Sequence, residues 1–244
     1  MAALVLVARL VTLNTRPMQT SALDLTKPGK HHHSHLAASV DGEYSKIMAR
    51  PWFRYFRNLR ETEITKFLSR HPKLSLGQVL DLGCADSVHL QLFPDDSLKI
   101  GVDPSMEALQ TSGKSVGSCL AAGDAASIPL KDKSINFVLA SGLIHHVHGF
   151  LEEVMREVFR VLVPGGVLYI DEPNGRNPLW KLVLMSPIGR EVDEGATKPF
   201  TVPQMLKSAN QFEHLDSMFY GLSRWPMLAV RWVVVLRKPW ESET

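Results

Sequence analysis

The sequence has few cysteines, little net charge and no long apolar run. Cys84 and Cys119 are the only cysteines among 244 residues, which excludes a disulfide framework and a cysteine-rich zinc site. No uninterrupted apolar stretch approaches the roughly 18 residues of a membrane-spanning helix. The net charge of +2 provides no overall attraction to nucleic acid. With 45% hydrophobic and 21% charged residues, the composition is that of a globular protein with a substantial core.

The excess positive charge lies at the N-terminus, where residues 1–40 carry a net charge of +3. The first 25 residues are apolar, contain Ser and Thr, and have no acid before Asp24. This composition is typical of a mitochondrial transit peptide, and a disordered extension explains it equally well. We therefore predict an N-terminal extension over residues 1–42, with a mitochondrial location or, failing that, a cytoplasmic one. The histidines at 31–35 lack partner carboxylates, so we expect a polar linker there and no metal.

A helical pattern runs from Asp41 to Arg70. Four arginines recur at spacings of four, three and three residues and form one stripe, with aromatic residues between them: Arg50, Arg54, Arg57 and Arg60. We expect an amphipathic helix that packs its rings on the domain and exposes its arginines to solvent. Contact with RNA or with an anionic acceptor is the alternative interpretation.

Short apolar runs then alternate with helical stretches, of which the clearest helix is 150–161. Pro164-Gly165-Gly166 is expected to end this helix. The predicted strands are 78–82, 99–102, 118–121, 135–140 and 166–170. Such alternation predicts βαβ units and a doubly wound α/β fold.

Polar and small residues follow these strands, and in open parallel sheets ligands bind beyond the carboxyl ends of the strands. Gly83 allows a ligand to approach the backbone closely, and Asp103 lies twenty residues further on, the spacing at which a carboxylate meets ribose hydroxyls. Asp124, after the third strand, can accept a hydrogen bond from an exocyclic amine. Together these residues predict a nucleoside site.

Four segments in this order resemble a class I S-adenosylmethionine-dependent methyltransferase, most closely those acting on small molecules and lipids: VLDLGCADS, IGVDPS, AAGDAASIPLKDKSINFVLASGLIHHV and REVFRVLVPGGVLYIDEPN. The resemblance covers residues 43–244. It implies a seven-stranded, mostly parallel, Rossmann-like sheet with an antiparallel last strand, and S-adenosylmethionine as cofactor.

The resemblance also implies roles for individual residues. Asp81 and Gly83 would line the methionine end of the cofactor, Asp103 would bind the ribose, and Asp124 with Ala125 would face the adenine. The same resemblance assigns three further residues to the cofactor site: Ala85, Pro104 and Ser141.

The family also accounts for the C-terminal part. Residues 200–209 resemble the helix that leads into the sixth strand, with Thr201 as its N-cap, and 232–236 resemble the antiparallel last strand. The insertion 174–199 is expected to form either a lid over the acceptor or a helical surface excursion.

The sequence departs from the family in its glycine-rich loop, where the three alternate glycine positions hold Gly83, Ala85 and Ser87. A Cβ atom at the second and third positions is expected to strain a residue with positive φ or to crowd the cofactor. Because alanine and serine are small and keep their N–H groups, we expect the loop to remain competent.

His146 and Glu172 are the predicted catalytic residues. His146 belongs to the His-His pair after the fourth strand, where a general base would meet the acceptor; a role in shaping the loop is equally consistent. Glu172 ends the fifth strand and is expected to contact the acceptor or the lid. Adjacent histidines without a third ligand do not predict a zinc site.

Three other functions compete. A nicotinamide dehydrogenase would need a glycine where Val88 stands. A tRNA-modifying methyltransferase shares the His-His segment, with the arginine stripe in its favour and the near-neutral body against it. A non-catalytic methyltransferase-like binding protein is compatible with Ala85 and Ser87. No residue identifies the acceptor or the oligomeric state.

Overall fold

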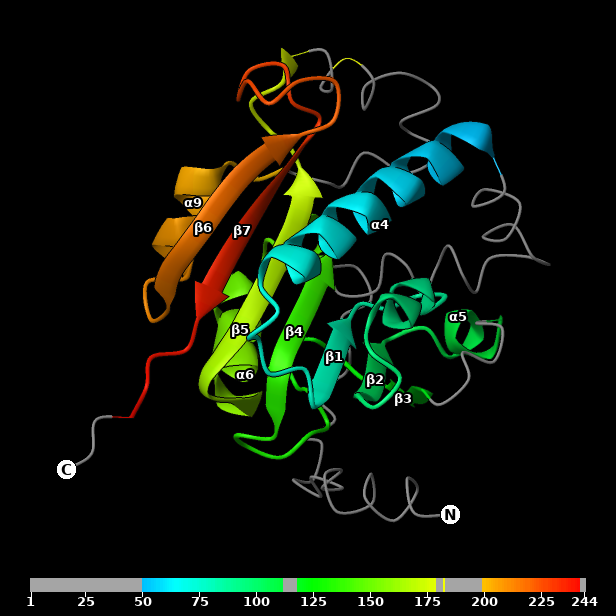
Figure 1. Ribbon diagram of the computed structural model, residues 1–244, viewed down its shortest axis with the longest axis vertical. Helices are drawn as coiled ribbons and strands as arrows, with labels where there is room; N and C mark the ends of the chain where they lie inside the picture. Colours follow the sequence, from blue (N-terminus) through cyan, green and yellow to red (C-terminus); the bar gives the residue numbers. More distant parts are fainter. Residues whose placement is uncertain (1–49, 112–117, 179–181, 183–198, 242–244) are drawn as a thin grey trace.

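Seven strands form one sheet in the order β3-β2-β1-β4-β5-β7-β6 (Figure 1). The computed structural model describes residues 50–111, 118–178, 182 and 199–241. Strand β7 runs antiparallel to both its neighbours and the other pairs are parallel, which confirms the predicted fold. The strands are β1 (Gln78–Leu82), β2 (Leu98–Asp103), β3 (Ser118–Ala122), β4 (Ile135–Ser141), β5 (Leu162–Pro173), β6 (Glu213–Tyr220) and β7 (Arg231–Arg237).

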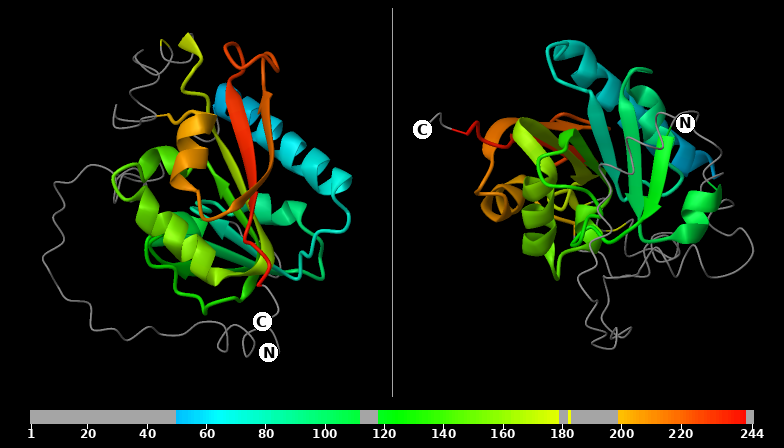
Figure 2. Two further views of the ribbon diagram at one scale, coloured as in Figure 1. Left: turned by 90° about the vertical axis from the view of Figure 1, so that its left-hand side faces the viewer. Right: turned by 90° about the horizontal axis from the view of Figure 1, so that it is seen from below.

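Helices cover both faces of the sheet. Helix α4 (Pro51–Arg70) packs on one face through Ile64 and Phe67, while α6 (Leu151–Val161) and α9 (Val202–Ser208) pack on the other (Figure 2). A short helix α5 (Met106–Thr111) and two 3₁₀ turns, η1 (Val88–Leu92) and η2 (Ile144–His146), complete the described elements. The three-layer arrangement buries the apolar side chains of both sheet faces.

Helix α6 forms because its apolar residues share one face, which the structure buries at Leu151, Val154, Val158 and Val161. The helix ends at Val161 and β5 begins at once with Leu162. The prediction that Pro164-Gly165-Gly166 ends the helix was therefore wrong. These residues lie inside β5, where the pairing register with β4 shifts, because a bulge accommodates glycine within a strand.

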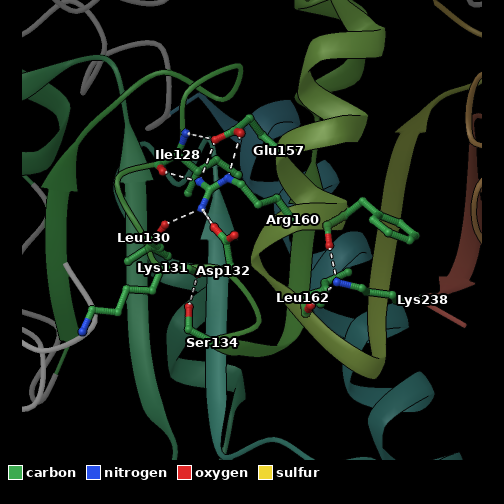
Figure 3. A network of polar contacts seen from close by, with 10 residues as sticks. Ile128, Leu130, Lys131, Asp132, Ser134, Glu157, Arg160, Leu162 and Lys238 are labelled. Atoms are coloured by element: carbon green, nitrogen blue, oxygen red, sulfur yellow. Dashed lines mark hydrogen bonds and ion pairs between the residues drawn. The ribbon is translucent and has the colours of Figure 1, made fainter. Parts of the chain in front are cut away.

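Arg160 fastens α6 to the connection between β3 and β4 (Figure 3). Its guanidinium donates hydrogen bonds to the Glu157 and Asp132 carboxylates and to the carbonyls of Ile128 and Leu130, at 2.7–2.8 Å. Glu157 also accepts the Ile128 N–H at 2.9 Å. Because Asp124 and Ala125 lie in this same connection, the network helps to hold the segment that leads out of β3.

The arginine stripe of α4 differs from its sequence-based interpretation. Arg54 is exposed as expected, but Arg57 turns to the domain and forms a 2.7 Å ion pair with Asp86 in the loop after β1. Tyr55, expected to pack inward, is 53% exposed. The helix therefore presents arginine to the acidic strand ends, because opposite charges in a partly buried setting attract more strongly than in water. The predicted N-terminal extension lies outside the described residues.

Helix α9 begins where Thr201 was predicted to cap it. The Thr201 side chain and Gln204 form a capping box, in which the Thr201 N–H donates to the Gln204 side chain at 2.9 Å. The two ends of the insertion 174–199 meet at this point, because the Gly175 N–H donates to the Phe200 carbonyl. A Cβ atom at Gly175 would lie 2.4 Å from the Pro199 carbonyl oxygen. Residues 179–181 and 183–198 lie outside the described residues, so the lid stays a prediction.

The loop after β1 contains the strain that the sequence predicts. Gly83 has φ 76°, and Ala85 and Ser87 also have positive φ, at 45° and 55°. The left-handed region costs a residue with a Cβ atom roughly 1–2 kcal/mol relative to glycine. The loop nevertheless keeps its turn, because the Ser87 N–H donates to the Cys84 carbonyl at 2.7 Å.

Replacing Ala85 by glycine should therefore stabilise the protein. Relief of strain outweighs the additional freedom of glycine in the unfolded chain, so we expect the free energy of unfolding to rise by about 0.5–1 kcal/mol. Chemical denaturation measures this change. Ala122→Gly, in the exposed end of β3, is the matched control and should lower stability by a similar amount. Equal losses in both variants would contradict the strained conformation.

Candidate functional site

The strand ends bring most of the predicted cofactor residues to one edge of the sheet. Asp81 pairs with Gly101 of β2 and Leu139 of β4, so the ends of these three strands are level. Asp103 ends β2 and Ser141 ends β4. Because the strands are parallel and adjacent, side chains far apart in the sequence converge at this edge.

Asp103 organises the loops around it. One carboxylate oxygen accepts the Ala85 N–H at 2.9 Å, and the other accepts the Ser105 N–H at 2.8 Å. Burial raises the pKa of Asp103, and the two backbone hydrogen bonds oppose that rise. Each oxygen retains a second lone pair, so the carboxylate can accept two more hydrogen bonds from a ribose. The alanine of the glycine-rich loop therefore still provides the N–H that orients this carboxylate.

Asp81 is a buried carboxyl group without a compensating partner. It is 1% exposed, and its Oδ2 atom has no hydrogen-bond partner among the described residues. Burial, with smaller effects from Asp103 and Asp86, raises its pKa from the ordinary 3.8 to about 8, although Arg60 opposes this. Near neutral pH burial therefore favours the protonated group, and a cation placed beside it would favour the ionised one.

His89 stands next to Asp81 without forming an ion pair with it. The His89 Nδ1 and Asp81 Oδ2 atoms are 3.9 Å apart, too far for a hydrogen bond. Burial, followed by Arg60 and Arg57, lowers the pKa of His89 well below its ordinary value, so the ring is neutral. Asp81 therefore keeps its capacity to bind a positive group from outside the chain.

The remaining cofactor residues surround this pair of carboxyl groups. Asp124 accepts the Ala126 N–H at 2.8 Å in a turn after β3, and Ala125 is buried in the core. Pro104 is exposed beside Asp103. The Ser141 hydroxyl is buried and has no hydrogen-bond partner among the described residues. The structure thus brings an acceptor for a ribose, an acceptor for a cation and an unused hydroxyl to one edge.

Gly83 makes room at the same place. A Cβ atom there would lie 3.0 Å from the end of the Leu143 side chain, and φ is positive, so both the space and the backbone conformation favour glycine. The unpaired Asp81 oxygen and the glycine turn fit S-adenosylmethionine, which is cationic at its methionine end and carries a ribose. The residues present therefore fit the implied cofactor.

Glu172 is attached to His145 and not to the predicted base His146. The buried Glu172 carboxylate accepts the His145 Nδ1–H at 2.6 Å and the Ile144 N–H at 2.6 Å. The ring centroids of His145 and His146 are 4.0 Å apart, and His146 is 9% exposed. The arrangement fixes the orientation and tautomer of His145 and leaves its Nε2 lone pair available. Sequence reasoning weighed both histidines but could not tell which one Glu172 would hold.

Sequence reasoning also missed a buried ion pair between Asp171, near the end of β5, and Arg231, at the start of β7. Asp171 accepts the Arg231 Nε–H at 2.8 Å and the Tyr220 hydroxyl at 2.7 Å. Burial, reinforced by Asp171, raises the pKa of Tyr220 well above its ordinary value. Arg231 follows a hairpin loop in the sequence, so only the pairing of β5 with β7 brings it to Asp171. In the described part of the chain, no three His, Cys, Asp or Glu residues are placed to hold a metal ion.

Comparison with known families identifies residues 80–170 as a methyltransferase domain. This range contains the strand ends of β1, β2, β3 and β4 and therefore most of the predicted cofactor residues. It also includes the Arg160 network that fastens the connection between β3 and β4.

Two curated proteins match over about half of the chain. A Bos taurus protein named "Probable tRNA methyltransferase 9B" is 26% identical over 144 residues, which are 56% of this chain and 30% of that protein. The trans-aconitate 2-methyltransferase of Paracidovorax citrulli is 28% identical over 130 residues, 51% of this chain and 49% of that enzyme. The match thus spans about a third and about half of the length of these relatives.

Among solved structures, an S-adenosylmethionine-dependent methyltransferase from Thermotoga maritima superimposes with a TM-score of 0.59. It is 20% identical, and the superposition covers 79% of this chain and 98% of that one, which shows a common fold. The matched domain and the strand order therefore agree with each other. Residues 80–170 thus match the methyltransferase-domain family, and the whole sheet has the Rossmann-like methyltransferase fold.

Proposed function

We propose that the protein transfers a methyl group from S-adenosylmethionine to a small-molecule or lipid acceptor. The observation that carries this proposal is the pair of buried carboxyl groups at adjacent strand ends, Asp81 and Asp103. Asp103 retains the capacity to accept hydrogen bonds from a ribose, and the Oδ2 atom of Asp81 has no hydrogen-bond partner among the described residues. Few ligands satisfy both demands at once.

The chain's own residues bind and orient the two reactants. The cofactor supplies an activated methyl group, so the protein's task is positioning and exclusion of water. Asp103 orients the ribose end, Asp124 and Ala125 face the adenine, and Asp81 meets the methionine end. Ser141, at the end of β4, lies between this site and the histidine pair in the sequence and offers a buried hydroxyl.

A small-molecule or lipid acceptor is favoured over RNA by the arrangement of α4. Arg57 is engaged with Asp86 at 2.7 Å, so the stripe does not present all its arginines outward. The near-neutral net charge gives no further attraction to a phosphate backbone. The bovine relative's name keeps tRNA modification as the second candidate, and a non-catalytic binding role as the third.

We infer that His145, held by Glu172, is the general base if the acceptor is a weak nucleophile such as a hydroxyl group. A base needs a fixed lone pair directed to the acceptor, and the 2.6 Å hydrogen bond to Glu172 fixes the ring. Glu172 is then a positioning residue, because its oxygens are engaged with Ile144 and His145. His146 remains the competing prediction.

Two sequence-based expectations remain proposals. The mitochondrial location rests on residues 1–40, which lie outside the described residues. The division into an extension over 1–42 and a domain over 43–244 rests on the same part of the chain.

Asp103→Asn should weaken cofactor binding about 30-fold or more, because the charged acceptor for the ribose is lost. Isothermal calorimetry with S-adenosylmethionine measures this, with Asp96→Asn, an exposed acid before β2, as the matched control. Labelled donor incubated with lipid, RNA and protein fractions then identifies the acceptor. Unaltered binding by Asp103→Asn, or no binding by the natural protein, would contradict the proposed site.

Cofactor binding should depend on pH through Asp81. In the free protein its pKa is about 8, and a bound cation lowers that pKa, so binding below pH 8 releases a proton. The affinity should therefore rise with pH, by up to about tenfold per unit, and level off near pH 8. Calorimetry at several pH values measures the rise. Asp81→Asn should bind with little pH dependence, and an unchanged slope in this variant would assign the effect to another group.

His145→Ala should lower turnover about 100-fold or more and leave the calorimetric affinity for the cofactor within about twofold. Glu172→Gln should lower turnover in the same direction, because the amide no longer fixes the imidazole tautomer. Transfer of labelled methyl into the acceptor fraction measures both. A larger loss with His146→Ala than with His145→Ala would give the catalytic role to His146.

A further inference from the structure

The loop between β6 and β7 exposes several large apolar side chains close together. Within the seven residues 222–228, the exposed fractions are 75% for Leu222, 72% for Trp225, 53% for Met227 and 45% for Leu228. Such a concentration on a short loop is unusual for a surface that meets only water, and it marks an interaction site. We call residues 221–229 the apolar loop.

The backbone of the apolar loop is held firmly while its side chains face outward. The Asn174 side chain donates to the carbonyls of Pro226 and Ala229 at 2.7 and 2.9 Å. The Asn177 side chain donates to the carbonyls of Leu228 and Ala229 at 3.2 and 3.0 Å. Both asparagines are at most 1% exposed. Exposure of the apolar side chains is thus built into the fold.

The charge around the apolar loop is positive. The two described segments that meet there, residues 173–178 and 217–231, contain no Asp or Glu. Arg224 within the loop and Arg176 between the two asparagines are both exposed. Exposed tryptophan and leucine side chains next to arginines, with no acidic residues nearby, are typical of a surface that binds the interface of an anionic bilayer.

The apolar loop lies at the functional edge of the sheet. Strand β6 runs in the same direction as β5, because both are antiparallel to β7. The loop after β6 therefore projects from the edge at which β1, β4 and β5 end, and Figure 1 shows it at the top of the molecule. A surface bound by this loop would face the same side as the predicted acceptor site.

We propose that the apolar loop docks the protein onto an anionic membrane surface, with Leu222, Trp225 and Met227 inserted among the lipids and Arg224 on the headgroups. A bilayer suits this loop better than an added β-strand, since the loop's carbonyls already accept hydrogen bonds from Asn174 and Asn177. This proposal rests on the proposed function: an amphiphilic acceptor held in that membrane would reach the predicted acceptor site without leaving the lipid. In the described part of the chain no helix could cross a bilayer, so attachment would be peripheral.

Sedimentation with vesicles tests this proposal with the full-length protein. We expect binding to phosphatidylcholine vesicles that contain phosphatidylserine and weaker binding to phosphatidylcholine alone. Trp225→Ser should weaken binding to the anionic vesicles about tenfold or more. Trp240→Ser is the matched control, because Trp240 is 67% exposed but packs against Gly165 at the opposite edge of the sheet.

A charge variant separates the two contributions. Arg224→Gln should weaken binding about fivefold on anionic vesicles and leave binding to neutral vesicles unchanged. Circular dichroism and calorimetry with S-adenosylmethionine should be unaffected in all variants, so that failure of docking and failure of the cofactor site are distinguished.

Three results would overturn membrane docking. In the first, the natural protein sediments with neither kind of vesicle, and in the second, Trp225→Ser binds as well as Trp240→Ser. In the third, Trp225→Ser and Arg224→Gln abolish salt-dependent retention of RNA while vesicle binding persists, which assigns the apolar loop to nucleic acid.

Discussion

The carboxylate of Asp103 is the interaction on which the candidate site depends. It accepts N–H groups from both the loop after β1 and the turn after β2, so one buried side chain sets the positions of two loops. That arrangement requires β1 and β2 to be parallel neighbours with level ends, as they are. A buried carboxylate is stable only when hydrogen bonds replace its hydration, and the loops supply these. The same two hydrogen bonds therefore position the loops and stabilise the buried charge.

Asp81, the second carboxyl group, lacks the hydrogen bonds that stabilise Asp103. Asp81 is buried, and its Oδ2 atom has no hydrogen-bond partner among the described residues, which costs stability in the free protein. Folded proteins retain such groups mainly where function requires them. Adjacent strands thus carry one acid whose two oxygens accept backbone hydrogen bonds and one acid with an unpaired oxygen, and the proposed function assigns them to the ribose and to the positive end of the cofactor.

Much of the fold follows from sequence patterns, because the strands and α6 are short apolar segments between glycine, proline and polar residues. The convergence of Asp81 and Asp103 could also be anticipated, since parallel strands end together. Three features could not. Whether Arg57 faces solvent or Asp86 depends on the rotation of α4, the choice of His145 by Glu172 depends on a 3₁₀ turn, and the pairing of Asp171 with Arg231 depends on the register of an antiparallel strand. Each of these three contacts is set by tertiary packing, which the periodicity of the sequence does not predict.

The hydrogen bonds that the Asn174 side chain donates to Pro226 and Ala229 connect the apolar loop with the end of β5. Asn174 follows Glu172 by two residues, and it binds the carbonyls of the apolar loop while Glu172 holds His145. The Asn174 side chain thereby ties the apolar loop to the chain just after β5. Only a few residues of backbone separate this outer surface from the strand end that carries Glu172.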